Sequence, residues 1–250
     1  MNFKTLEALL ASIGRLTSLE TLNIERCYAL RELPASISAM TRLTSLRLRK
    51  RGLNLKELPS SLGDLQALKS LKLQNLLVLE ALTTSIARLT SLETLYIELC
   101  DKLQELPETI VALTNLHELS IHGCPMTALL ASIGALTNLT KLFLFACELM
   151  DVPSSIESLT ALRYLRLNAR PDGRAFQTLS CALPSLRLLQ ELHLHKLGED
   201  DVLAIGRSLK VRPLPLLNLD SSSWKTLKCC WQALGLPPAA AGCDNMTILE

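Results

Sequence analysis

The chain has 250 residues, 48% of them hydrophobic, and a formal net charge of +2. So small a charge does not favour nucleic acid as a partner, and the apolar runs fall short of the roughly 18 residues that a membrane-spanning helix needs. The first six residues do not read as a secretory signal. We therefore expect a cytoplasmic protein without a membrane span.

A short leucine pattern recurs along the chain at an interval of 23 to 27 residues. Copies of Leu-x-x-Leu-x-Leu/Ile begin at Leu19, Leu43, Leu68, Leu92, Leu116, Leu139 and Leu162, and looser copies begin at Leu189 and Leu214. A fixed period of this length is typical of a solenoid in which every repeat adds one short strand. Because side chains alternate between the two faces of a strand, the leucines are predicted to point inward and the residues between them outward.

The segments between the predicted strands carry an inward aliphatic residue at every third position, which favours 3₁₀-like turns over long α-helices. In four repeats a proline, which pre-sets φ, precedes this turn: Pro34, Pro59, Pro107 and Pro153. Four cysteines occupy the position at which the chain leaves the strand: Cys27, Cys100, Cys124 and Cys147. We expect these cysteines to be buried thiols that help to satisfy backbone groups of the loop.

These residues resemble the leucine-rich repeat family, with the form L-x-x-L-x-L-x-x-N/C-x-x-L-x-x-L-P-x-x-I-x-x-L. The cysteine combined with LPxSI is similar to the repeats of plant intracellular Ras-group proteins, nucleotide-binding immune receptors and bacterial effectors. The resemblance covers roughly residues 5 to 220. It implies an α/β solenoid, a horseshoe with a parallel β-sheet on its concave face and short 3₁₀ turns or helices on its convex face. Thr83 and Leu130 depart from the pattern, since they replace the proline.

We expect three parts along the chain: a partial repeat or N-terminal cap over residues 1–16, about nine repeats over 17–220, and a capping helix with a loose tail over 221–250. Residues 9–17 closely repeat residues 129–137, so the start is either a makeshift cap or a piece of a longer protein. The helix predicted around Trp224 and Trp231 is either a lid over the last coil or a docking helix for a partner. A further amphipathic helix is predicted after Gly198, ending near Leu209.

The outward strand positions predict a binding surface on the concave face. Four of the chain's nine aromatic residues lie there, among cationic side chains, which resembles interface hot spots. The alternative for Phe143 and Phe145 is that they only cover neighbouring strands. The basic residues near Arg47 suit either an acidic partner or a solvated face. The predicted partner-binding residues are Arg47, Arg49, Lys72, Tyr96, Glu98, Ser120, His122, Phe143, Phe145, Tyr164, Arg166 and His193.

Signals of catalysis or metal binding are weak. His117 and His122 are separated by one residue too many for a zinc-protease motif, and they fall on a predicted strand. Glu191, His193 and His195 share a face, but solvated strand residues are the more common reason for such a pattern. No phosphate-binding loop or nucleophile elbow occurs in the sequence. We therefore expect no catalytic residue, no metal and no cofactor.

The sequence favours a non-enzymatic recognition module or scaffold that binds a protein partner through the concave sheet, typically in signalling. The alternative is a sensor or substrate-recognition fragment of a larger signalling protein, immune receptor or effector ubiquitin ligase. An enzyme within this chain is the weakest hypothesis. Neither the partner nor the oligomeric state follows from the residues.

Overall fold

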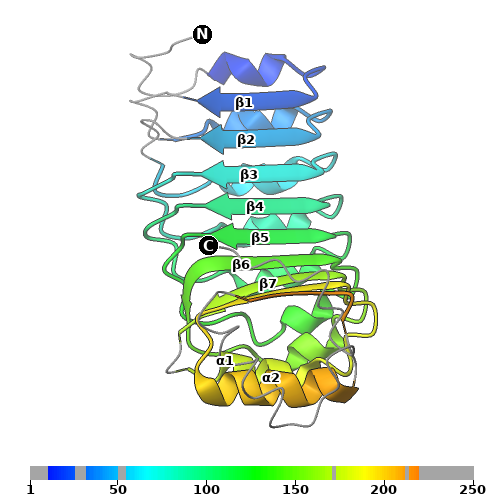
Figure 1. Cartoon of the computed structure of the whole chain (residues 1–250). Helices are drawn as coiled ribbons and strands as arrows, with labels where there is room; N and C mark the ends of the chain where they lie inside the picture. The colour runs from blue at the N-terminus through cyan, green and yellow to red at the C-terminus, as the bar shows by residue number, and fades with distance from the viewer. Residues whose placement is uncertain (1–10, 26–31, 50–54, 171–172, 212–213, 220–250) are drawn as a thin grey trace. The chain divides into compact units, whose positions relative to one another are not determined.

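The computed structural model describes residues 11–25, 32–49, 55–170, 173–211 and 214–219 (Figure 1). Between Met126 and Thr127 the chain divides into two units. The predicted thiol at Cys27 and the helix expected around Trp224 lie outside the described residues. The expected three-part organisation stays a prediction, because residues 1–10 and 221–250 also lie outside them.

The first unit is built on five parallel strands, which lie side by side in chain order (Figure 1). Their bounds are β1 Thr21–Glu25, β2 Ser45–Arg49, β3 Ser70–Gln74, β4 Thr94–Glu98 and β5 Glu118–His122. Equivalent leucines pair across the strands, for example Leu46 with Leu71 and Leu48 with Leu73. These four leucines are fully buried, and each buried leucine side chain stabilises the fold by roughly 1.5–3 kcal/mol.

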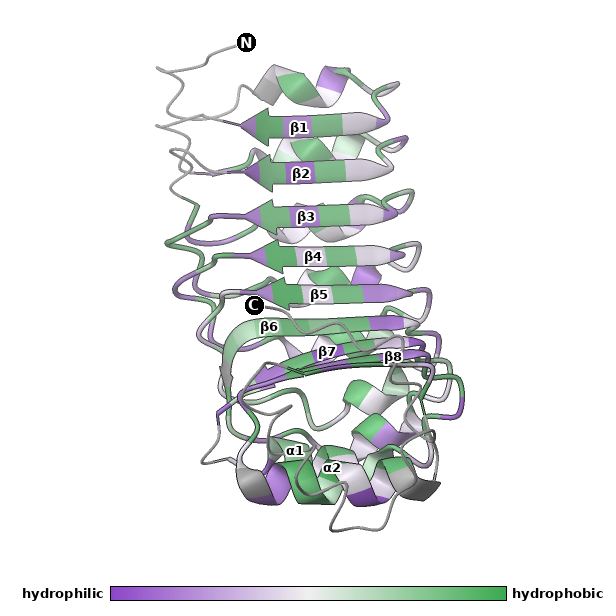
Figure 2. Cartoon of the chain, in the orientation of Figure 1, coloured by the Kyte–Doolittle hydropathy of each residue, from purple (hydrophilic) through white to green (hydrophobic). Residues whose placement is uncertain are grey.

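The alternation of buried and outward residues confirms the expected strand pattern. Figure 2 shows hydrophobic and hydrophilic segments alternating along the strands of the first unit. In β2, Leu46 and Leu48 are buried while Arg49 is exposed and Arg47 is partly exposed. In each unit, the side of the strands that carries the outward residues is called the open face.

A short 3₁₀ turn precedes each strand of this unit. These turns are η1 Ala11–Arg15, η2 Ala35–Ala39, η3 Ser60–Asp64, η4 Thr84–Arg88 and η5 Glu108–Ala112. Pro34, Pro59 and Pro107 precede three of them with extended backbone angles, as expected. Thr83 replaces the proline before η4, and its hydroxyl accepts a hydrogen bond from the Ser85 N–H at 3.4 Å. A side-chain cap therefore takes over the position of the missing proline.

The second unit is built on four parallel strands paired in chain order. Their bounds are β6 Lys141–Leu149, β7 Tyr164–Ala169, β8 Glu191–His195 and β9 Leu216–Leu219. The register between β6 and β7 shifts between Leu144 and Leu149. The 3₁₀ turns are η6 Ile133–Ala135 and η7 Ser154–Ser158, and η6, in the repeat where Leu130 replaces the proline, is the shorter of the two.

Two α-helices replace 3₁₀ turns in the later repeats of the second unit: α1 Ala175–Ala182 and α2 Glu199–Val211. The helix α2 confirms the prediction made from the residues after Gly198, whereas α1 is not predicted. The two helices contact each other, and the Ser208 hydroxyl of α2 donates to the Ser180 carbonyl of α1 at 2.6 Å. The predicted α/β solenoid is thus confirmed, with turns in some repeats and helices in others.

Five of the described residues have positive φ. Asn75, Leu99, Gly123 and Lys196 each directly follow a strand, and Ala146 lies within β6. This left-handed conformation turns the chain away from the strand direction. Cysteine thiols brace the same turn, since Cys100 Sγ lies 3.7 Å from the Glu98 carbonyl and Cys147 Sγ lies 3.6 Å from the Phe145 carbonyl. Cys100, Cys124 and Cys147 are buried, as predicted.

Candidate functional site

The predicted binding residues of the first unit do share one open face. Strand pairing places Arg47, Lys72, Tyr96 and Ser120 in one row, and Arg49, Gln74, Glu98 and His122 in the next row. Neighbouring strands lie about 4.8 Å apart. Side chains that are some 24 residues apart in sequence therefore become direct neighbours.

A hydrogen-bonded relay links three of these side chains. Arg47 Nε donates to Gln74 Oε1 at 2.7 Å, and Gln74 Nε2 donates to Glu98 Oε2 at 2.5 Å. His122 Nδ1 lies 3.8 Å from Glu98 Oε1. The relay that begins on β2 therefore reaches β5. Gln74 is only 8% exposed and is not among the predicted site residues. Gln74 links Arg47 on β2 to Glu98 on β4. The sequence of β3 alone does not indicate this link, because both charged residues lie on other strands.

Tyr96 lies beside this relay. Burial raises the pKa of its phenol above the ordinary value, and the negative charge of Glu98 and a hydrogen bond to it raise it further. The charge of Arg47 acts in the opposite direction but is the smallest of these effects. The phenol is therefore a protonated hydrogen-bond donor throughout the physiological pH range.

Ser120 differs from the expectation for an exposed site residue. It lies in the predicted row but is only 6% exposed. It is a short side chain that pairs across the strands with the much larger Tyr96. A partner that contacts this row would therefore meet the ring of Tyr96 before the hydroxyl of Ser120.

The open face of the second unit carries the other predicted residues. Phe143, Arg166, His193 and Asn218 form one row, and Lys141, Tyr164 and Glu191 form another. The Arg166 guanidinium carbon lies 4.1 Å from the centroid of the Phe145 ring. Lys141 Nζ lies 5.8 Å from the centroid of the Tyr164 ring. Cations and aromatic rings are thus in direct contact on this face.

The rings of Phe145 and His195 meet edge to face with their centroids 5.4 Å apart. They belong to β6 and β8, which as next-but-one strands lie roughly 9.6 Å apart. Both rings must therefore lean over β7, where Asn168 pairs with His195. This arrangement accounts for the burial of Asn168, which is 6% exposed. Phe145 thus covers a neighbouring strand, which is the alternative to a binding role that the sequence left open. Its ring also contacts Arg166.

Several buried polar atoms on this face have no hydrogen-bond partner among the described residues. They are Arg166 Nε, Asn168 Oδ1, His193 Nδ1 and Asn218 Oδ1. The other ring nitrogen of His193 lies 3.4 Å from Glu191 Oε2. Unsatisfied buried polar groups are uncommon in folded proteins because each one costs desolvation free energy. The two open faces therefore differ. In the first unit Arg47, Gln74 and Glu98 bond one another, whereas these four atoms of the second unit have no partner among the described residues.

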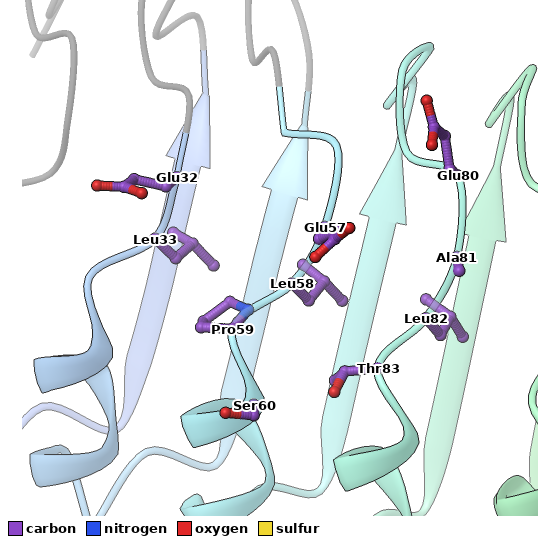
Figure 3. Close-up of a pocket in the computed structure, with 10 residues that line it drawn as sticks. All are labelled: Glu32, Leu33, Glu57, Leu58, Pro59, Ser60, Glu80, Ala81, Leu82 and Thr83. Atoms are coloured by element: carbon purple, nitrogen blue, oxygen red, sulfur yellow. The ribbon is translucent and has the colours of Figure 1, made fainter.

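A groove of about 510 Å³ lies in the first unit, beside the segments that precede η2, η3 and η4. Figure 3 shows Leu33, Leu58 and Leu82 at equivalent places in successive repeats. The exposed side chains of Glu32 and Glu57 belong to the same lining. The repeated Glu-Leu-Pro sequence is the signal from which this feature could have been predicted. Its carboxylates are open to water, so it lacks the desolvated polar groups of the open faces.

Within the described ranges, no group of three His, Cys, Asp or Glu side chains is placed to hold a metal ion. None of the helices described is both long and apolar enough to cross a membrane.

The sequence over residues 60–232 matches a family model described as leucine-rich repeat region. No curated protein matches the chain at the level of sequence. The matching family model spans well over half of the chain, and it includes β3 to β9.

Solved structures resemble the chain in fold. The leucine-rich repeat domain of the type III effector XCV3220 (XopL) is 21% identical, with 94% of this chain and 78% of that chain covered and a TM-score of 0.62. Internalin C2 of Listeria monocytogenes is 24% identical, with 77% and 78% covered and a TM-score of 0.56. The plant peptide hormone receptor RGFR1, in complex with RGF2, is 20% identical with a TM-score of 0.47, and the chain covers only 44% of it.

Proposed function

Because the chain belongs to the leucine-rich repeat family, whose model matches residues 60–232, we propose that it is a non-enzymatic recognition module. It binds a protein partner through the open faces of its parallel strands. Solenoid proteins expose a broad sheet surface of this kind, and partners can contact several repeats at once.

The observation that carries the proposal is the arrangement of aromatic and cationic side chains on strands held in register. Tyr96 lies between Lys72 and Ser120 in one row, and Arg166 contacts the ring of Phe145. Tyr and Arg are enriched among residues that dominate binding energy. A core of fully buried leucines holds these side chains in place before binding, so little conformational entropy is lost when a partner docks.

The same proposal places the chain in a reducing compartment such as the cytoplasm. Cys100, Cys124, Cys147 and Cys181 are free thiols, and persistent free thiols are more common where disulfides do not form. Location in cells of a tagged intact chain tests this part of the proposal independently of binding.

Affinity capture with the intact chain, followed by measurement of the dissociation constant of the captured protein, tests the binding function. Tyr96→Ala and Phe143→Ala each remove a ring from an open face, and we expect each to weaken binding by about 10-fold or more if it is a hot spot. Leu77→Ala and Leu188→Ala are matched controls, since both remove exposed apolar side chains that lie outside the strands. Equal effects of the ring variants and the controls would refute the proposed face.

The alternative, a sensor fragment of a larger signalling protein, immune receptor or effector ligase, stays a prediction. Reading the gene on both sides of this frame tests it, because a nucleotide-binding or catalytic domain there would support it.

A further inference from the structure

We propose that Arg166 is the anchor for a carboxylate of the partner, an Asp or Glu side chain on an extended segment that lies across the open face of the second unit. This inference rests on the proposed recognition function and names the chemistry that the partner must bring.

The environment of Arg166 is incomplete without such a group. Its guanidinium carbon contacts the face of the Phe145 ring, and its buried Nε has no hydrogen-bond partner in the described ranges. A guanidinium has five N–H donors, and contact with a ring face satisfies none of them. Among the described residues Arg166 forms no ion pair. The carboxylate of Glu191, on the neighbouring strand, lies 3.4 Å from His193 Nε2 instead. Stacking on the ring fixes the plane of the guanidinium, and its two outer nitrogens are the donors that can meet a planar carboxylate.

Arg47 shows what the same kind of residue looks like when its partner is internal. It also lies in the middle of a strand on an open face, but its Nε donates to Gln74, which in turn donates to Glu98. Arg47 is therefore linked through Gln74 to the carboxylate of Glu98. Within the part of the chain that the structure describes, Arg166 has no such link, although Glu191 lies on the neighbouring strand β8.

The amide oxygens near Arg166 narrow the class of ligand. Asn168 and Asn218 are 6% and 4% exposed, and no described residue donates a hydrogen bond to the Oδ1 of either. A free inorganic anion would satisfy the guanidinium and leave these acceptors unpaired. A peptide supplies both kinds of group, because each backbone amide has an N–H donor and the acidic side chain provides the acceptors. Asn168 lies beneath the rings of Phe145 and His195, so a docked segment that leaves the Phe145 ring in place reaches the acceptor of Asn218.

The dimensions suit a short extended segment. Arg166, His193 and Asn218 pair in register across β7, β8 and β9. Two strand spacings amount to roughly 10 Å, about three residues of extended peptide. A segment crossing the strands can thus place its acid at Arg166 and a backbone N–H near Asn218.

Selection from a displayed library of random dodecamer peptides against the intact chain tests the inference. We expect the selected peptides to be enriched in Asp or Glu at one position. Binding of a synthetic copy should fall about 10-fold or more on Arg166→Gln, and to an intermediate extent on Arg166→Lys, which keeps the charge and loses the planar fork. Changing the acidic residue of the peptide to its amide should have the same effect as Arg166→Gln, and the two changes together should cost no more than either alone.

Arg163→Gln is the charge-matched control. Arg163 is exposed in the same repeat, one residue before β7, and should leave peptide binding unchanged. The thermal midpoint of each variant separates docking from structure. Because Arg166 forms neither a hydrogen bond nor an ion pair with the other described residues, Arg166→Gln should keep the wild-type midpoint.

The possible failures are distinguishable. Peptides that lose affinity on Phe143→Ala but not on Arg166→Gln would overturn the anchor and leave the proposed function standing. Peptides that respond to neither change, or a chain that enriches no peptide, would overturn both. A lowered midpoint for Arg166→Gln with unchanged peptide affinity would show that the cation–ring contact is structural.

Discussion

Gly123 packs against the side chain of Leu99 in the preceding repeat. Its φ is +62°, and a Cβ added to it would lie 2.7 Å from Leu99 Cδ2. Leu99 itself occupies the equivalent turn with φ +51°. The two residues therefore combine a left-handed backbone with close contact between neighbouring repeats.

Replacing Gly123 by alanine should destabilise the protein by about 1–2 kcal/mol, because a residue with a Cβ is strained in the left-handed region. The clash with Leu99 adds less, since the end of that side chain can rotate away. Urea unfolding of Gly123→Ala measures the sum. In the double variant with Leu99→Ala only the clash should disappear, and full recovery of stability there would contradict a backbone origin.

Breaking the relay at Gln74 should destabilise the first unit. Gln74→Met keeps the length of the side chain but removes its bonds to Arg47 and Glu98. Hydrogen bonds to charged groups contribute about 1.5–3 kcal/mol each when buried, and partial exposure of both ions lowers the expected loss to about 1–2 kcal/mol. Gln104→Met is the control, because Gln104 is exposed, and urea unfolding should show no comparable change there.

The stability of the chain should fall in the alkaline range through Tyr96. Its pKa is raised in the fold by burial first and by Glu98 second, so above pH 10 the folded state binds more protons than the unfolded state. The stabilising contribution is complete below the ordinary pKa of tyrosine and is lost as the pH rises through the folded value. The tyrosinate absorbance of the wild type minus that of Tyr96→Phe isolates this titration. Glu98→Gln should lower the pKa of Tyr96, and an unchanged titration would contradict the assignment of Glu98.

Alkylation should distinguish the described cysteines by burial. Cys181 is exposed, whereas Cys100, Cys124 and Cys147 are buried. The neighbouring Cys124 thiol, and then burial, also raise the pKa of the Cys100 thiol, which disfavours the reactive thiolate. Peptide mapping after brief iodoacetamide treatment should find Cys181 modified and the other three intact until urea is added. Early modification of Cys100 would show that its repeat opens in the folded protein.

Much of the fold follows from local sequence. The period of the leucines predicts the strands and their inward side chains, and Pro34, Pro59 and Pro107 mark where the 3₁₀ turns begin. Helix α1 is missed because Ala175–Ala182 has no acidic residue in its first turn and no side-chain cap at its start. Left-handed turns are evident at Gly123, but nothing in the residue types of Leu99 or Lys196 indicates them.

The candidate site is predicted less completely. The alternation of strand residues correctly assigns Arg47, Tyr96 and Arg166 to open faces. It does not indicate that Ser120 is buried beside Tyr96 or that Gln74 joins two charges.

The sequence by itself determined the repeat, the inward leucines and the set of outward side chains, because these depend on residues within one strand or turn. Only the tertiary structure decided which outward groups satisfy one another. Parallel pairing brings Gln74 between Arg47 and Glu98, and it brings Phe145, rather than an acid, against Arg166. Such neighbours come from different repeats. Which polar groups find a partner within the described residues is therefore decided by the stacking of the strands.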